Sequence, residues 1–200
     1  MILRSSPLSP FGRKVKISAA LLGLGTALTV VVADTMSPDD SLRRENPLGK
    51  IPALILDDGT KLYDSRVIVE YLDHLAGGGR LIPTEPGQRF QALTLQALSD
   101  GIADAALLQV YERRWRAEDR TESRWLDHQA GKVARGLSAL EATPPSGPID
   151  IGHVALACAL GYLDLRFDGT WRELHPALVA WLDVFAAAVP AFAATHPGPA

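Results

Sequence analysis

Cysteine is scarce in this chain of 200 residues, since Cys158 is the only one. A lone cysteine permits no intrachain disulfide and no cysteine-rich zinc site. We therefore expect no metal centre and a reducing, cytoplasmic setting. A basic excess is missing as well: 20 Lys and Arg against 23 Asp and Glu leave a formal net charge of -3, which argues against nucleic acid as a partner.

The chain also lacks a long, uniform apolar run. One uncharged stretch, Ile17 to Val32, has Gly23 and Gly25 in its middle and changes there from Ala- and Leu-rich to Thr- and Val-rich sequence. This pattern predicts the end of a helix, a glycine turn and a strand, and not a membrane span. The opening residues carry no secretory signal pattern, and 47% apolar with 22% charged residues is typical of a folded globular protein.

The first 80 residues alternate strand and helix signals. The Asp-Gly pair within residues 57–60 predicts a hairpin. Strands are expected at residues 2–4, 26–33, 53–56 and 61–63, helices at 10–24 and 64–75, and a short polar helix or turn at 38–45. The order βαβαββα defines an α/β unit.

Three consecutive glycines at 77–79, followed by Pro83 and Pro86, interrupt this alternation and predict a connection between domains. Beyond it, apolar residues are spaced for helices alone, at about 87–117, around 125–140, at 150–166 and at 176–189. We therefore divide the chain into an α/β domain at residues 1–76, a linker at 77–86 and an all-α domain at 87–200.

Two helix starts carry side chains suited to a ligand. In Ser9-Pro10-Phe11-Gly12-Arg13-Lys14 a hydroxyl precedes the first helix, where unpaired N–H groups favour negative charge. In Tyr63-Asp64-Ser65-Arg66, Ser65 and nearby N–H groups suit a carboxylate, and Asp64 suits an ammonium. Both motifs are equally compatible with plain N-capping, because Ser and Asp are favoured caps and Pro is a favoured first helical residue.

A third motif, Asn46-Pro47-Leu48-Gly49-Lys50-Ile51-Pro52-Ala53, is a turn that enters a strand. These three stretches, with Asp-Ser-x-x-Ile-x-Glu-Tyr-Leu at 64–72 and the helical segment Ser99 to Leu107, resemble the cytosolic glutathione transferases. The form of the motifs resembles the bacterial YibF-like branch in particular.

The resemblance implies a thioredoxin-like N-terminal domain, a helical C-terminal domain, a homodimer and glutathione as co-substrate. It implies that Pro52 is cis and that Ser9 faces the glutathione sulfur. Ile51 would pair through its backbone with the cysteinyl part. Asp64 and Ser65 would hold the γ-glutamyl end, and Lys50 the glycyl carboxylate.

Those roles define a reaction type. A hydroxyl donor at Ser9 and the helix N-terminus would stabilise a thiolate, which is the nucleophilic form of a thiol. The sulfur would then attack a small apolar electrophile in a pocket lined by Phe11, Tyr111 and Trp115. Serine cannot form the mixed disulfide that thioredoxin-like redox chemistry requires, so we expect conjugation. A glutathione-binding or regulatory protein with little catalysis, and a glutathione-dependent isomerase or dehalogenase, remain alternatives.

Three further residues are weighed against plain structural roles. Asp100 is either an acidic residue that reaches a ligand's amino group across the dimer or a solvated helix-face side chain. Cys158 is expected to be buried packing. Asp150 is expected to cap a helix with Ile149 and Val154 as a hydrophobic staple. The superfamily has an acidic residue three positions after the cap, where this chain has His153, so the sequence does not predict a reciprocal capping bond.

Overall fold

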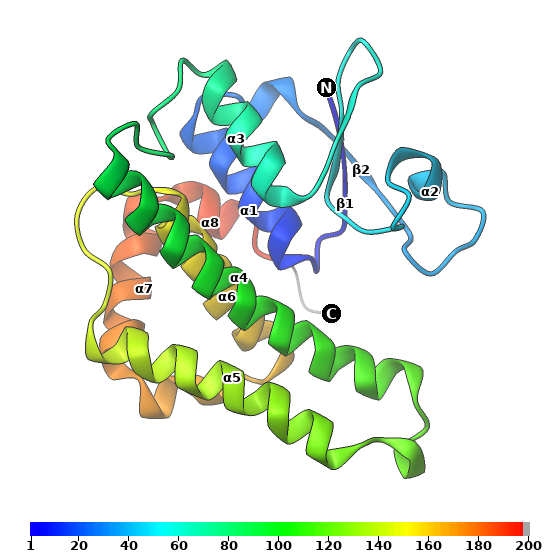
Figure 1. Cartoon of the computed structure of the whole chain (residues 1–200), viewed down its shortest axis with the longest axis vertical. Coiled ribbons are helices and arrows are strands. Elements are labelled where there is room, and N and C mark those ends of the chain that lie inside the picture. Colours follow the sequence, from blue (N-terminus) through cyan, green and yellow to red (C-terminus); the bar gives the residue numbers. More distant parts are fainter. Residues whose placement is uncertain (198–200) are drawn as a thin grey trace.

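The computed structural model describes residues 1–197. Its N-terminal part is a four-stranded sheet in the order β2-β1-β3-β4 (Figure 1). The strands are β1 (Ile2–Ser5), β2 (Thr29–Val32), β3 (Ala53–Ile55) and β4 (Lys61–Leu62), and the helices among them are α1 (Pro10–Leu21), α2 (Leu42–Glu45) and α3 (Ser65–Leu75). β1 pairs in parallel with β2 and antiparallel with β3, which is antiparallel to β4. The predicted βαβαββα order and thioredoxin-like fold are therefore confirmed.

Two N-terminal elements, α1 and β2, are shorter than predicted. Helix α1 ends at Leu21 and not at residue 24. Residues 25–27 form a 3-10 turn, so β2 starts at Thr29 and not at Thr26. The short polar helix or turn predicted at 38–45 is confirmed, because residues 38–41 form turns and a bend and α2 spans one helical turn. Polar residues dominate this segment and offer few apolar side chains for a longer helix to bury.

The remainder is helical, as predicted. The helices are α4 (Pro86–Trp115), α5 (Ser123–Ala142), α6 (Ile151–Arg166), α7 (Pro176–Ala188) and α8 (Pro190–Ala194). The last one was not predicted, and it starts at a proline, as helices often do. The long helices α4 and α5 lie side by side, and α8 lies against α1 (Figure 1). Residues 1–76, 77–86 and 87–200 remain our proposed division of the chain.

Helix α6 is the centre of the helical part, because 13 of its residues are buried. It packs so closely on α4 that a Cβ atom at Gly152 would lie 2.7 Å from the Cβ of Leu95 and 2.8 Å from the carbonyl oxygen of Ala92. A side chain at position 152 would therefore force the two helices apart.

The start of α6 corrects one expectation. Asp150 accepts a hydrogen bond from the backbone N–H of His153 at 3.1 Å, and the backbone N–H of Asp150 donates to Nδ1 of His153 at 3.4 Å. Histidine thus closes a reciprocal capping box, because its ring nitrogen stands in for the usual carboxylate. Val154 lies in the main core and Ile149 packs against it, while their mutual contact as a hydrophobic staple stays a prediction.

Candidate functional site

Ser9 lies at the start of α1, partly exposed, with extended backbone angles. Its Oγ accepts a hydrogen bond from the backbone N–H of Gly12 at 3.1 Å, and Pro10 is the first helical residue. Among residues 1–197 no acceptor is hydrogen-bonded to the Ser9 hydroxyl proton. The side chain therefore caps the helix and keeps a donor for a ligand at the same time.

The first turn of α1 sits directly on β1. A Cβ atom at Gly12 would lie 2.0 Å from the Oγ of Ser5, which is fully buried. Only glycine permits this approach. The contact fixes Ser9 and the N–H groups of the first turn relative to the sheet.

Asp64 caps α3 in a similar way, since its Oδ1 accepts a hydrogen bond from the backbone N–H of Arg66 at 2.9 Å. The carboxylate is exposed, whereas Ser65 is buried. The peptide bonds Tyr63–Asp64 and Ile51–Pro52 are both cis, the second as the resemblance implied.

Lys50 and Ile51 are presented by a turn that Asn46 holds. Asn46 is buried, and its Nδ2 donates to the carbonyl oxygen of Lys50 at 2.8 Å while its Oδ1 accepts from the N–H of Leu48 at 3.1 Å. Gly49 in this turn has a φ of 60°, in the left-handed region that favours glycine. The Lys50 side chain is exposed, and Ile51 is half-buried beside Pro52.

Asp104, which the sequence analysis did not select, lies near these residues on α4. Partial desolvation of its carboxyl raises the pKa, although the residue as a whole is exposed; the charge of Asp100 raises the pKa further, while Arg66 and Lys50 act in the opposite direction. The charge of Asp64 also acts on it. A signal was available, because Asp104 lies one helical turn after Asp100.

Asp100 is not at the surface, where either expectation had placed it. It is buried, and both of its oxygens accept from Nζ of Lys14, at 2.7 and 2.8 Å. Nε of Arg66 donates to the same carboxylate at 3.1 Å. We call Lys14, Arg66 and Asp100 the Lys14 cluster. The cluster joins α1, α3 and α4, so the observed role of Asp100 is to connect the two domains within its own chain.

The three aromatic residues predicted for the electrophile pocket lie in different surroundings, and their place in such a pocket stays a prediction. Phe11 is half-buried against the core, Tyr111 has the Arg114 guanidinium 5.5 Å from its ring, and Trp115 is 64% exposed.

A small cavity of about 10 Å³ lies next to Ser9. Leu8, Arg13, Cys158, Tyr162 and Leu165 are among its lining residues. The Arg13 guanidinium is buried, donates to the carbonyl oxygen of Phe192 at 2.5 Å and lies 4.0 Å from that ring's centroid. Helix α6 therefore supplies apolar surroundings next to Ser9, and Phe192 of α8 holds the Arg13 guanidinium beside them.

Cys158 has the packing role predicted for it. Burial raises the pKa of its thiol to about 12, although Arg13 and Lys14 oppose the shift. A thiol with that pKa stays protonated at neutral pH, so it is a poor nucleophile.

Residues 1–197 hold no group of three or more His, Cys, Asp or Glu side chains arranged to bind a metal ion. Within the same part of the chain, no helix is long and apolar enough to cross a membrane.

Comparison with known proteins now defines the class. Residues 3–80 match the family described as "Glutathione S-transferase, N-terminal domain" and residues 123–184 match "Glutathione S-transferase, C-terminal domain". A solved glutathione transferase family member from Pseudomonas fluorescens Pf-5, with bound glutathione, superposes with a TM-score of 0.92 at 42% identity, covering 98% of each chain.

Two further relatives agree. A glutathione S-transferase from Methylobacillus flagellatus KT, also with bound glutathione, gives a TM-score of 0.90 at 35% identity over 98% of this chain and 99% of that one. The "Uncharacterized GST-like protein YibF" of Escherichia coli (strain K12) is 33% identical over 171 residues, 83% of each chain. The chain belongs to the glutathione S-transferase family.

Proposed function

We propose that this protein is a serine-type glutathione transferase that conjugates the glutathione thiolate to small apolar electrophiles. The observation that carries the proposal is the state of Ser9. Its oxygen is used in capping α1, and its proton is not donated to any residue among 1–197. The solved relatives that hold glutathione support the choice of the thiol ligand.

In this proposal Ser9 donates a hydrogen bond to the sulfur, and the N-terminus of α1 adds its partial positive charge. Each unit by which the pKa of the bound thiol falls corresponds to about 1.36 kcal/mol of preference for the thiolate. The free thiol has a pKa of about 8.5, so even a modest depression makes the thiolate abundant at neutral pH. With a halogenated aromatic, a C–S bond forms, the C–halogen bond breaks, and halide leaves with the electron pair.

The remaining roles are assigned by position around Ser9. The Ile51 backbone would pair with the cysteinyl part, Asp64 and Ser65 would bind the γ-glutamyl end, and Lys50 would meet the glycyl carboxylate. The Asn46 turn that presents Lys50 and Ile51, the position of Asp64 and Ser65 at the start of α3, and the charges of Lys50 and Asp64 that both act on Asp104 support this assignment.

We also propose a homodimer. Apolar side chains on α3 and α4 are exposed in the single chain, namely Val67, Leu75 and Phe90. Contact with a second copy would remove this apolar surface from water.

The test of catalysis separates capping from thiolate stabilisation. Ser9→Ala removes both, and we expect conjugation of a halogenated aromatic to fall about 100- to 1,000-fold, the usual effect of losing one donor to a developing or stabilised anion. Ser9→Asp restores a cap of equal quality, yet places a carboxylate next to the sulfur. We therefore expect Ser9→Asp to fold well and to be at least as inactive as Ser9→Ala.

Ser6→Ala is the matched control, because Ser6 is a hydroxyl in the same loop that accepts only from the N–H of Leu8. Ultraviolet absorbance of the bound thiolate, titrated against pH, reports the sulfur directly. If Ser9→Asp is active and the pKa of the bound thiol is unchanged, Ser9 serves only as a helix cap, and the proposed stabilisation of the thiolate is wrong.

A further inference from the structure

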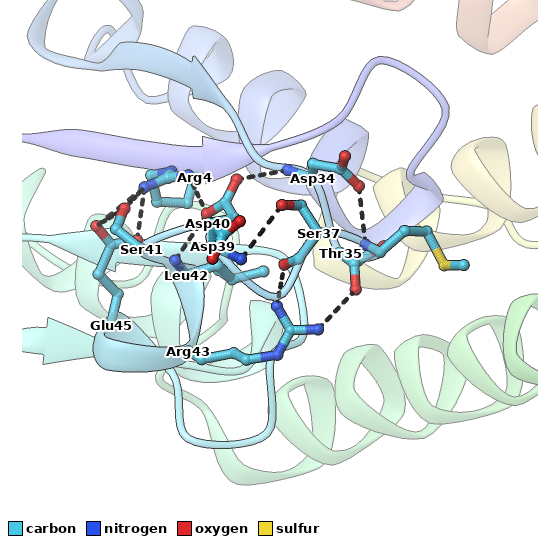
Figure 2. Close-up of polar contacts among 11 residues, drawn as sticks. Arg4, Asp34, Thr35, Ser37, Asp39, Asp40, Ser41, Leu42, Arg43 and Glu45 are labelled. Atoms are coloured by element: carbon cyan, nitrogen blue, oxygen red, sulfur yellow. Dashed lines mark hydrogen bonds and ion pairs between the residues drawn. The ribbon is translucent and has the colours of Figure 1, made fainter.

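Arg4, at the centre of β1, is the hub of a second ionic cluster that the mechanism does not use (Figure 2). Its Nη1 donates to the Oγ of Ser41 at 2.6 Å and to Oε2 of Glu45 at 2.8 Å, and its Nη2 donates to Oδ1 of Asp40 at 2.7 Å. We call Arg4, Asp40, Ser41 and Glu45 the Arg4 cluster. One buried guanidinium thus holds two carboxylates and a hydroxyl from a single stretch of chain.

Asp40 extends the cluster into the backbone of that stretch. Its Oδ2 accepts from the N–H of Asp34 and its Oδ1 from the N–H of Leu42, both at 2.7 Å (Figure 2). Hydrogen bonds from these two N–H groups lower the pKa of Asp40, and Arg4 lowers it further. Through one carboxylate, Arg4 therefore fixes the start of residues 34–45 and the start of α2 together.

Little else attaches this segment to the domain. Its buried apolar contact is a small cluster of Leu42 with Ala33 and Ala53, separate from the main core. Nζ of Lys61 adds a hydrogen bond to the carbonyl oxygen of Arg44 at 2.9 Å. Segments with few buried apolar contacts open locally at low free-energy cost. The Arg4 cluster is consequently the main polar restraint among the described residues that keeps residues 34–45 closed.

The segment continues directly into the proposed glutathione site. The N–H of Asn46 bonds to the carbonyl oxygen of Leu42 at 2.7 Å, and the Asn46 side chain holds the carbonyl of Lys50. On its other side, Arg4 pairs across the sheet with Ala53, next to Pro52. Arg4 is therefore connected from both directions to the turn that carries Lys50 and Ile51.

We propose that Arg4 is a positioning residue that sets the affinity for the glycyl end of glutathione. It does not contact the ligand. It keeps residues 34–50 in the closed conformation that presents the Lys50 side chain to the glycyl carboxylate. The inference rests on the proposed function. If only a fraction of molecules is closed, the apparent Kd rises by the inverse of that fraction.

The experiment compares glutathione with γ-glutamylcysteine, which lacks the glycyl residue, by calorimetry. For Arg4→Gln we expect the Kd of glutathione to rise about tenfold, since the competent fraction falls, and the Kd of γ-glutamylcysteine to rise much less. Arg4→Lys keeps the charge without the bidentate fork, so we expect an intermediate loss. Added guanidinium ion should partly restore glutathione affinity in Arg4→Gln but not in the wild type.

Arg44→Gln is the matched control, because Arg44 is an exposed cation of the same helix whose side chain makes none of the cluster contacts. Hydrogen exchange adds a second readout. Amides of Asp34, Leu42 and Asn46 should exchange faster in Arg4→Gln, whereas that of Leu156 in α6 should not. If Arg4→Gln does not fold, Glu45→Gln replaces it, because this variant keeps the pair between Arg4 and Asp40. We expect it to raise the Kd of glutathione more than that of γ-glutamylcysteine, but by a smaller factor than Arg4→Gln.

The outcomes separate this inference from the proposal on which it rests. A wild-type protein that binds neither ligand overturns both. A wild-type protein that binds both, with an Arg4→Gln variant that weakens them equally, overturns the positioning role alone and leaves Arg4 as a structural residue.

Discussion

The Lys14 cluster and the Arg4 cluster both tie the edges of the proposed site together, but they do so in different surroundings. In the first, the side chains of Lys14 and Asp100 are 1% and 4% exposed. In the second, Asp40 and Glu45 keep 13% and 20% of their side-chain surface. The pair of Lys14 and Asp100 is sealed from solvent, although Arg66 of the same cluster is 55% exposed, and the Arg4 cluster lies at the solvent edge.

The difference determines what happens when each cluster is broken. A buried carboxylate that loses its partner has no water to replace it, and the penalty falls on the whole fold. A carboxylate at the edge is rehydrated once its segment opens, so the penalty stays local. The sealed cluster therefore suits the joint between two domains, and the edge cluster suits a segment that opens and closes around a ligand.

The largest effect is expected for Lys14→Met, which leaves Asp100 buried with only the exposed Arg66 nearby. We expect the free energy of unfolding to fall by about 3–5 kcal/mol. Lys14→Met combined with Asp100→Leu should recover most of the loss, because an apolar pair of similar volume is often as stable as the ion pair. Chemical denaturation measures the free energy of unfolding of both variants. If Lys14→Met lowers it by less than about 1 kcal/mol, Asp100 is not sealed from solvent.

Much of the fold was readable from local sequence. Ser9, Asp64 and Asp150 were each predicted to precede a helix, and each caps one. Caps, turns and helical spacing are encoded within a few residues. The three motifs around the proposed site could be selected for the same reason, because each lies at the end of an element.

The ionic contacts were not readable in this way. Lys14 and Asp100 are 86 positions apart, and Arg4 and Asp40 are 36 apart. Nothing local to a charged residue indicates which distant charge it meets after folding. One partial signal existed: Lys14 shares the buried face of α1 with Pro10 and Ile17, which predicts an enclosed cation that needs a partner.

The cavity walls were missed for a related reason. Tyr162 and Cys158 reach Ser9 only because α6 packs against α1. Their sequence context describes an apolar helix, and such a helix is compatible with any buried surface. Phe11, Tyr111 and Trp115 are not among the residues that line this cavity, so their place in an electrophile pocket stays a prediction.

An intermediate effect is expected from acid, which should act on the edge cluster through Asp40. Its pKa lies below the ordinary value of about 3.9. The Asp40 carboxylate therefore binds a proton more tightly when residues 34–45 are open than when they are closed. The stabilisation by this carboxylate is complete above the ordinary pKa and is lost as the pH falls through the lower value of the closed state. Arg4 faces Asp40 directly, and Glu45 faces it across Arg4.

We expect the Asp34 and Leu42 amides to lose protection from hydrogen exchange as the pH falls below about 4, after correction for intrinsic exchange. The matched variant is Asp40→Asn, which cannot titrate and should show low protection at every pH with no added acid dependence. If Asp40→Asn keeps the acid transition of the wild type, another group is responsible and the assignment to Asp40 is wrong.

The smallest effect is expected from salt, and it tests the comparison most directly because both clusters are measured under one change of solvent. The screening length falls from about 8 Å at physiological ionic strength to about 3 Å at 1 M salt. Ions reach the partly exposed Asp40 and Glu45 but not the sealed pair of Lys14 and Asp100. The stability difference between the wild type and Arg4→Gln should therefore shrink by a few tenths of a kcal/mol at high salt, as for exposed pairs. The difference between the wild type and Lys14→Met should stay constant. If high salt reduces the stability difference equally for both variants, water and ions reach Asp100. The distinction between a sealed pair and a partly exposed cluster would then be wrong.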